Sequence, residues 1–249
     1  MLLSLVPGTL SQSETTAPSQ AAPDTAQIVQ AIKRHDQTQE KTLKRYQASR
    51  HYEVEYRGFF KNITARMDVE LEYDAATGKS FKIVSQSGSH TLCEKVLKRA
   101  LDSEKDASVD RGAHALTPAN YNFQLLGSET LNGRLSYILQ VDPVSGSQYL
   151  YRGKIWVDAA DGAVSRMEVQ PAKNPSFWIS QTLIRQTNSK TGDFWLPQQN
   201  QSETKVRVGG KAVLTIDYGP YQISLPQSPQ SVSSDDMELA TGSLRAAVR

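Results

Sequence analysis

The chain has 249 residues, of which 38% are hydrophobic and 22% charged, and its formal net charge is +2. This length suits one large β-rich domain or two small ones, and the composition is typical of a globular protein, not of a disordered or membrane-spanning one. The basic residues are dispersed and form no block interleaved with aromatic residues, which argues against a nucleic-acid-binding surface.

The single cysteine, Cys93, excludes an intramolecular disulfide and a cysteine-based metal cluster. We interpret Cys93 as a small buried hydrophobe on a helix.

Residues 1–24 are predicted to be a leader. Residues 1–10 are apolar but too short to span a bilayer, and residues 11–24 are rich in Ser, Thr, Ala, Pro and Gln. We interpret this segment as a signal-peptide remnant followed by a flexible linker, with an ordinary disordered cytosolic N-terminus as the alternative. No cysteine lies near it to carry an acyl anchor. We therefore expect an exported, soluble periplasmic protein that is a monomer.

An amphipathic helix is predicted over residues 25–48. Asp24 is a good N-cap, and Gln27 is placed to close a capping box. Residues on one face then recur at helical spacing: Ile28, Ile32, His35, Leu43 and Tyr46.

After this helix the period changes to two. Tyr52, Val54 and Tyr56 alternate with charged residues, and in residues 63–73 six apolar positions alternate with polar ones. A turn at 74–78 leads into a third strand over 79–87. These features predict a meander of three strands.

The second half of the chain is predicted to be a helix, a loop and further strands. The helix is expected at 91–106, and the polar stretch 103–119 is expected to be a long mobile loop. Strands are then predicted at 121–127, 134–142, 148–158, 163–170, 178–188, 203–208 and 212–222. The connections between them contain residues typical of tight turns, such as Asn132-Gly133 and Gly209-Gly210.

These elements predict an α+β fold that is mainly β, with one antiparallel sheet of about ten strands. Such a wide sheet is strongly twisted. Two helices can cover only part of one face, so we expect a curved sheet with helices in its hollow, where a ligand could bind. The domain is expected to span residues 25–225, and residues 226–249 are expected to be a flexible tail.

The available residues argue against a catalytic site. The four histidines are scattered without zinc-binding spacing. The sequence also lacks a Gly-x-Ser-x-Gly elbow and the glycine motifs that bind phosphates or dinucleotides. We therefore expect no metal, no cofactor and no enzymatic activity. A hydrolase that uses dispersed carboxylates is the alternative.

The segment 149–157 is apolar or aromatic on both of its faces. A sheet with one solvated face would not need this pattern. Either this strand is central and covered on both sides, or one of its sides lines a lipid cavity.

Four nearby motifs carry a family resemblance: residues 151–158 (YRGKIWVD), 161–166 (DGAVSR), 171–179 (PAKNPSFWI) and 192–197 (GDFWLP). They resemble bacterial outer-membrane lipoprotein-sorting proteins of the LolA and LolB superfamily, and the resemblance extends over about 25–222. It implies an open half-barrel of antiparallel strands with helices as a lid, and acyl chains bound inside. The chain departs from LolA in two ways, because the arginine that holds that lid closed has no assigned counterpart and the 103–119 loop is long.

The predicted function is a periplasmic carrier that holds lipid or the acyl chains of lipoproteins during transfer toward the outer membrane. The alternative is an envelope-stress sensor of the same fold that detects lipoproteins and binds a membrane protein partner. The candidate cavity residues come from the apolar phases of the best-defined strands, although each one taken singly is better explained as a core residue. They are Tyr56, Met67, Val69, Leu71, Phe123, Leu125, Tyr137, Leu139, Tyr151, Ile155 and Trp178.

Overall fold

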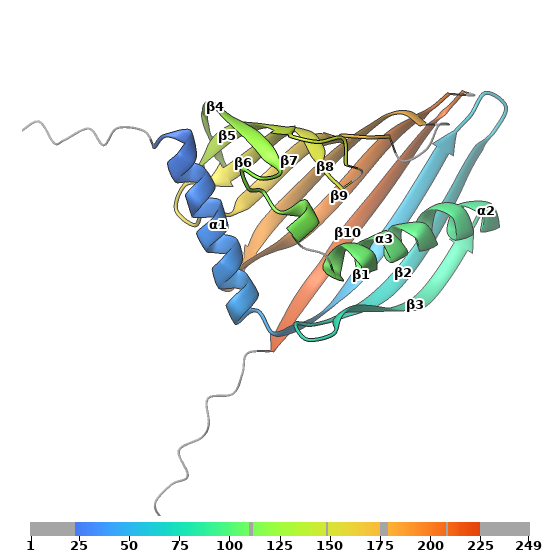
Figure 1. Ribbon diagram of the computed structural model, residues 1–249. Helices are drawn as coiled ribbons and strands as arrows, with labels where there is room; N and C mark the ends of the chain where they lie inside the picture. Colours follow the sequence, from blue (N-terminus) through green and yellow to red (C-terminus); the bar gives the residue numbers. More distant parts are fainter. Residues whose placement is uncertain (1–22, 110–111, 148, 175–178, 208, 225–249) are drawn as a thin grey trace, which may run out of the picture.

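A ten-stranded antiparallel sheet with helices on one face forms the protein (Figure 1). The computed structural model describes residues 23–109, 112–147, 149–174, 179–207 and 209–224, so most of the predicted leader and the whole 226–249 tail lie outside the described residues. The strands are β1 (Arg45–Arg57), β2 (Asn62–Asp74), β3 (Gly78–Gly88), β4 (Tyr121–Leu131), β5 (Arg134–Pro143), β6 (Tyr151–Asp158), β7 (Val164–Pro171), β8 (Ile179–Thr191), β9 (Phe194–Val206) and β10 (Lys211–Ser224). The predicted class, a mainly β fold with an open antiparallel sheet of ten strands, is confirmed.

The strand order is β3-β2-β1-β10-β9-β8-β7-β6-β5-β4. The predicted hairpins are therefore present, but the first strand pairs with the last one, with Tyr52 opposite Ile216 and Val54 opposite Leu214. This pairing leaves β3 and β4 as the two edges of the sheet. The chain must cross from one edge to the other between them, and it does so over the face that carries the helices.

Helix α1 (Thr25–Thr42) begins as predicted, with the capping box of Asp24 and Gln27 formed in both directions. It ends six residues earlier than expected, because the alternating burial of β1 starts at Arg45. Tyr46 is thus a strand residue, and its ring stacks on that of Tyr73 with 4.9 Å between the centroids. Its helical spacing from the preceding apolar residues was misleading.

The second helical segment runs from His90 to Val109 in three consecutive pieces. These are α2 (His90–Leu92), a π-helical stretch η1 (Cys93–Leu97) and α3 (Lys98–Val109). The prediction that residues 103–119 form a loop was wrong for 103–109, which are helical. A short 3-10 turn, η2 (Gly112–His114), follows. We call residues 90–109 the α2–α3 cover, because they lie over β1 to β3 (Figure 1).

Strand β9 begins nine residues before its predicted start at 203. Its first three residues, Phe194 to Leu196, are all buried, so they show no alternation from which a strand could be recognised. The predicted turn around Gly192 and Asp193 is confirmed as the β8–β9 connection.

Three apolar clusters fill the inner face, which we define as the face that carries the helices. The first lies under the α2–α3 cover and includes Tyr52, Val54, Met67, Val69, Cys93 and Leu97. The second lies under α1 and includes Ile28, Ile32, Leu139, Val141, Ile155 and Val157. The third lies where β1, β2 and β9 meet and includes Leu43, Tyr46, Leu71, Tyr73, Phe194 and Leu196. The predicted burial of Cys93 on a helical segment is confirmed.

A network of charges fixes the β6–β7 turn close to α1. The carboxylate of Asp158 is 1% exposed and accepts two hydrogen bonds from Arg134, at 2.6 and 2.8 Å. Asp161 accepts from Arg134 at 2.8 Å and from the indole Nε1 of Trp195 at 2.9 Å. Burial raises the pKa of Asp158, but the bonds from Arg134 and from the backbone of Asp161 outweigh it and leave the pKa below its usual range.

We expect Asp158→Ala to lower the free energy of unfolding by about 2 kcal/mol, because it removes a buried carboxylate that accepts from Arg134 and from the backbone N–H groups of Ala160 and Asp161. Chemical denaturation at neutral pH measures this loss. Since the pKa of Asp158 is depressed on folding, its contribution is present at neutral pH and is lost as the pH falls through that depressed value. The control is Glu70→Ala, which removes an exposed ion pair with Lys82 and should change stability by less than about 0.5 kcal/mol. Equal losses in both variants would contradict the prediction.

Candidate functional site

The structure distributes the predicted cavity residues over all three clusters. Met67 and Val69 lie in the cluster under the α2–α3 cover, Leu139 and Ile155 lie under α1, and Leu71 lies in the third cluster. The remaining described residues are less deeply buried: Tyr56, Phe123, Leu125, Tyr137 and Tyr151. Trp178 lies outside the described residues. Met67, Leu139 and Ile155 are 0% exposed, so they are core residues while the helices are in place. Whether any of the set contacts a ligand stays a prediction.

Tyr151 lies at the start of β6. Its backbone N–H donates to the hydroxyl of Tyr121 at 3.3 Å, and burial raises the pKa of its own phenol. Tyr121 belongs to the cluster under α1, and Tyr151 therefore borders that cluster.

Polar side chains lie between the two large apolar clusters. Asn200 and Ser202 are directly opposite Ile216 and Leu214 on β10, so they share the inner face with them. The amide Nδ2 of Asn200 donates to Oε1 of Gln186 at 3.2 Å. The middle of the inner face can therefore hydrogen-bond a polar group, while the regions on either side of it are apolar.

A groove of about 680 Å³ opens between α1, the segment that connects α3 to β4, and the starts of β1 and β9. This volume is within the range of about 300–1,000 Å³ typical of ligand sites. Apolar and aromatic side chains contribute part of the lining: Leu43, Tyr46, Tyr73, Leu116 and Leu196. Charged and polar side chains, mostly from α1, contribute the rest: Lys33, Asp36, Gln37, Gln39, Glu40, Lys79 and Glu104. The groove is thus amphipathic.

Helix α1 is attached to the wall of this groove by a pair of hydrogen bonds. The side chain of Gln39 donates to the carbonyl of Trp195 at 3.1 Å and accepts from the N–H of the same residue at 3.0 Å. Both bonds engage the start of β9, so the position of α1 sets the width of the groove.

A buried arginine attaches the α2–α3 cover to the sheet. Arg50 on β1 is 2% exposed and forms an ion pair with Glu104 on α3, which also accepts from Lys79 of β3 at 2.7 Å. The guanidinium carbon lies 4.6 Å from the ring centroid of Tyr218 and 5.5 Å from that of Phe81. Two strands and the helix therefore meet at one charged cluster in an otherwise apolar region.

The charges of this cluster are stable at neutral pH. Burial raises the pKa of Glu104, but attraction to Lys79 and Arg50 outweighs it, and the pKa lies below its usual range. Burial likewise lowers the pKa of Arg50, and Glu104 outweighs it so that this pKa is raised. Burial raises the pKa of the neighbouring Tyr52 to about 12, which keeps that phenol neutral.

Sequence reasoning missed Arg50, although a signal was present. Arg50 occupies the apolar phase of β1 between Ala48 and Tyr52, where a charge requires a buried partner. Its partner Glu104 lay where the predicted helix 91–106 and the predicted loop 103–119 overlap. Together Arg50 and Glu104 hold the α2–α3 cover to the sheet.

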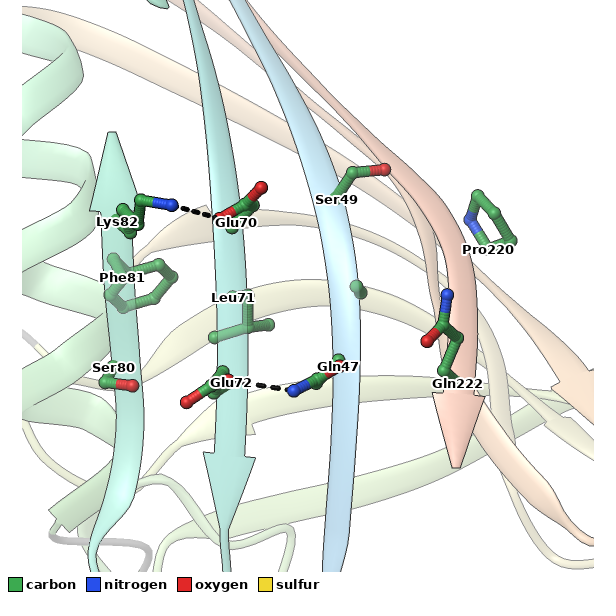
Figure 2. Close-up of a pocket in the computed structure, with 11 residues that line it drawn as sticks. Gln47, Ser49, Glu70, Leu71, Glu72, Ser80, Phe81, Lys82, Pro220 and Gln222 are labelled. Atoms are coloured by element: carbon green, nitrogen blue, oxygen red, sulfur yellow. Dashed lines mark hydrogen bonds and ion pairs between the residues drawn. The ribbon is translucent and has the colours of Figure 1, made fainter. Parts of the chain in front are cut away.

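A second hollow of about 600 Å³ lies over β10, β1, β2 and β3 (Figure 2). Figure 2 shows Lys82 reaching toward Glu70 and Gln47 toward Glu72, and these pairs are 2.9 and 2.8 Å long. Seven of the eleven lining residues are polar, Glu70 forms an ion pair with Lys82, and Glu72 accepts a hydrogen bond from Gln47. This surface suits water better than an apolar ligand. Within the described residues, no group of three or more His, Cys, Asp and Glu side chains could hold a metal ion.

We expect Glu104→Gln to loosen the α2–α3 cover by about 3 kcal/mol, because Arg50 then keeps its buried charge without a carboxylate partner. Hydrogen exchange should quicken in residues 98–105 and stay slow in β5 and β6. Glu94→Gln is the matched control, since it removes a half-exposed pair with Lys98 in the same helical segment. If both variants exchange alike, Glu104 does not hold the helix.

The same contact predicts a pH dependence. Because the pKa of Glu104 is depressed on folding, its stabilising effect is complete at neutral pH and is lost as the pH falls through the depressed value. The protection factors of residues 98–105, which are exchange rates corrected for the intrinsic effect of pH, should therefore fall in acid in the wild type but change much less in Glu104→Gln. A parallel response of the two proteins would contradict this assignment.

Comparison with known proteins gives structural similarity only. No family model matches the chain, and no curated protein matches its sequence. One similar structure is a DUF1329 family protein from Desulfovibrio piger, with 14% identity, coverage of 87% of this chain and 98% of that one, and a TM-score of 0.41. Another is a putative outer membrane lipoprotein-sorting protein domain from Vibrio parahaemolyticus, with 9% identity, 87% and 99% coverage and a TM-score of 0.40.

A third similar structure is a LolA superfamily protein from Nitrosomonas europaea, with 11% identity, 87% and 100% coverage and a TM-score of 0.37. Identities and scores this low carry no argument about the family or the function of this chain. The open antiparallel sheet with helices on its inner face is consistent with a LolA-like half-barrel.

Proposed function

We propose that the protein is a periplasmic carrier that binds lipid, or the acyl chains of lipoproteins, on its inner face and transfers them toward the outer membrane. The observation that carries this proposal is the amphipathic groove between α1 and the sheet, which continues into the third apolar cluster through Leu43, Tyr46 and Leu196. An acyl chain has the matching chemistry, with an apolar tail for the aromatic wall and a polar head for the charged one.

The energetics favour such a ligand. Burial of each CH₂ group of an acyl chain contributes about 0.8 kcal/mol, so a hydrophobic hollow can hold a lipid without a dedicated ionic clamp. The groove alone offers limited apolar surface, and a longer acyl chain needs additional apolar surface to be buried. Displacement of the α2–α3 cover would provide it, because Met67 and Val69 lie directly beneath that helical segment.

The Arg50–Glu104 pair sets the cost of this displacement. Separation of a buried ion pair leaves a buried charge without its partner, which is costly, so this pair strongly favours the closed position. In this proposal the closed structure is the unloaded or partly loaded carrier. The rest of a long acyl chain enters the region beneath the α2–α3 cover only when α3 moves away from the sheet.

The periplasmic location is part of the proposal and is supported by the apolar start of the chain and by the family resemblance. Over the residues that the structure describes, none of the helices is both long and apolar enough to cross a bilayer.

Native mass spectrometry of the purified full-length chain, combined with displacement of a fluorescent fatty acid, tests the proposal. We expect co-purifying lipid, or saturable uptake of the probe with a stoichiometry near one. A protein that is free of lipid and takes up no probe at any concentration would refute the carrier function.

We expect Ala115→Trp to weaken probe binding by roughly tenfold or more, because the indole fills a groove whose wall includes Ala115. Ala115 is only half-buried, so the variant should remain folded by circular dichroism. Ser128→Trp on the edge strand β4 is the matched control, because Ser128 is exposed and does not line the groove, and it should bind normally. Charged substitutions at Met67 or Leu139 are poorer tests, since these side chains are fully buried and such variants would unfold. Normal binding by Ala115→Trp would place the ligand elsewhere.

A further inference from the structure

Two phenylalanines protrude from the connection between β1 and β2. Phe59 is 81% exposed and Phe60 is 100% exposed, the highest values among the large apolar side chains described as exposed. The fold does not use them, because neither belongs to any of the three clusters. Exposure of two adjacent aromatic rings costs solubility, and such patches commonly mark an interaction site.

The two rings are presented on an ordered support. The N–H of Gly58 donates to the carbonyl of Lys61 at 3.1 Å, which closes the turn. The hydroxyl of Tyr56 donates to the carbonyl of Gly209 at 2.9 Å and ties this turn to the adjacent β9–β10 connection. Gly210 has a φ of +95°, and a Cβ placed there would lie 2.7 Å from the backbone carbonyl oxygen of Arg57. Glycine at this position therefore lets the two hairpin ends pack closely.

Positive charge surrounds the rings. Arg57 is opposite both Asn62 and Lys211, so the ends of both hairpins lie at the same rim of the sheet. Basic side chains outnumber acidic ones in these two hairpin ends: Arg57, Lys61, Lys205, Arg207 and Lys211 against Glu55 and Glu203. Both acids are already paired, Glu55 with Arg57 at 2.9 Å and Glu203 with Lys211 at 2.7 Å.

We infer that this aromatic and basic tip docks on a bilayer surface that contains anionic lipids. Aromatic rings enter the boundary between headgroups and acyl chains, and the binding strength grows with the apolar area buried there. Lysine and arginine side chains are attracted to anionic headgroups within about one Debye length of the surface. This docking is independent of the proposed cargo, since the groove lies at the opposite rim of the sheet, beside the β2–β3 and β8–β9 turns.

Co-sedimentation of the full chain with vesicles tests the inference. We expect binding to vesicles of phosphatidylcholine mixed with phosphatidylglycerol, weaker binding to phosphatidylcholine alone, and a decline as salt is raised. The double variant Phe59→Ser with Phe60→Ser should bind the anionic vesicles roughly tenfold less well. Lys61→Glu should weaken binding to anionic vesicles and leave the weak binding to phosphatidylcholine unchanged.

The matched control is the double variant Leu126→Ser with Leu135→Ser. It removes two apolar side chains that are 46% and 47% exposed on β4 and β5, away from the tip, and it should bind vesicles normally. Circular dichroism and fatty-acid displacement should be unchanged in all of these variants, which separates a failure of docking from a failure of the carrier function. The inference is overturned if the wild type does not bind vesicles or if the phenylalanine variant binds as well as the wild type. It is equally overturned if vesicle binding does not depend on the lipid charge and the salt concentration. It is also overturned if the phenylalanine variant alters only self-association in the absence of vesicles.

Discussion

The pairing of β1 with β10 is the constraint on which the rest of the structure depends. It joins the first and last strands along nearly their whole length, with a register shift between Ala48 and Arg50. Without it the chain would form two separate sheets, each with additional exposed edges. With it, the connection from β3 to β4 must run from one edge of the sheet to the other, so the α2–α3 cover and α1 lie on the same face (Figure 1). One face thus becomes an interior and the other remains a solvated surface.

The inner face is covered in parts and not as one continuous core. Each helical segment covers its own apolar cluster, and hydrogen-bonded amides such as Asn200 and Gln186 lie between the two. The attachments of the covers are polar: Gln39 holds α1 to β9, and Glu104 holds α3 to Arg50. Each of these attachments is a separate hydrogen-bonded or ion-paired contact, and its loss leaves a buried polar group without its partner. A face built in this way can open under one cover while the other stays in place.

The groove and the aromatic tip lie at opposite rims. Strand β1 links them, and its 13 residues span about 40 Å in extended conformation. A membrane at the tip would therefore leave the groove accessible, which is compatible with a carrier that exchanges cargo while it is docked. The outer face between the rims is dominated by paired charges and amides, such as Glu70 with Lys82 and Gln47 with Glu72, and it suits contact with water (Figure 2).

Local patterns in the sequence determined much of the fold. The capping box at Asp24, the alternation in residues 63–73 and the glycine-containing turns each depend on residues close in the chain, and the structure contains all of them. Tertiary structure decided the remainder. The β1–β10 pairing joins residues more than 150 positions apart, and a period of two identifies the two faces of a strand but not its neighbour. Helix α3 extends past residue 106, and its Glu104 meets Arg50, 54 residues earlier. Likewise, Met67 and Tyr46 are both buried on the inner face, and only the positions of the helices place Tyr46 beside the groove.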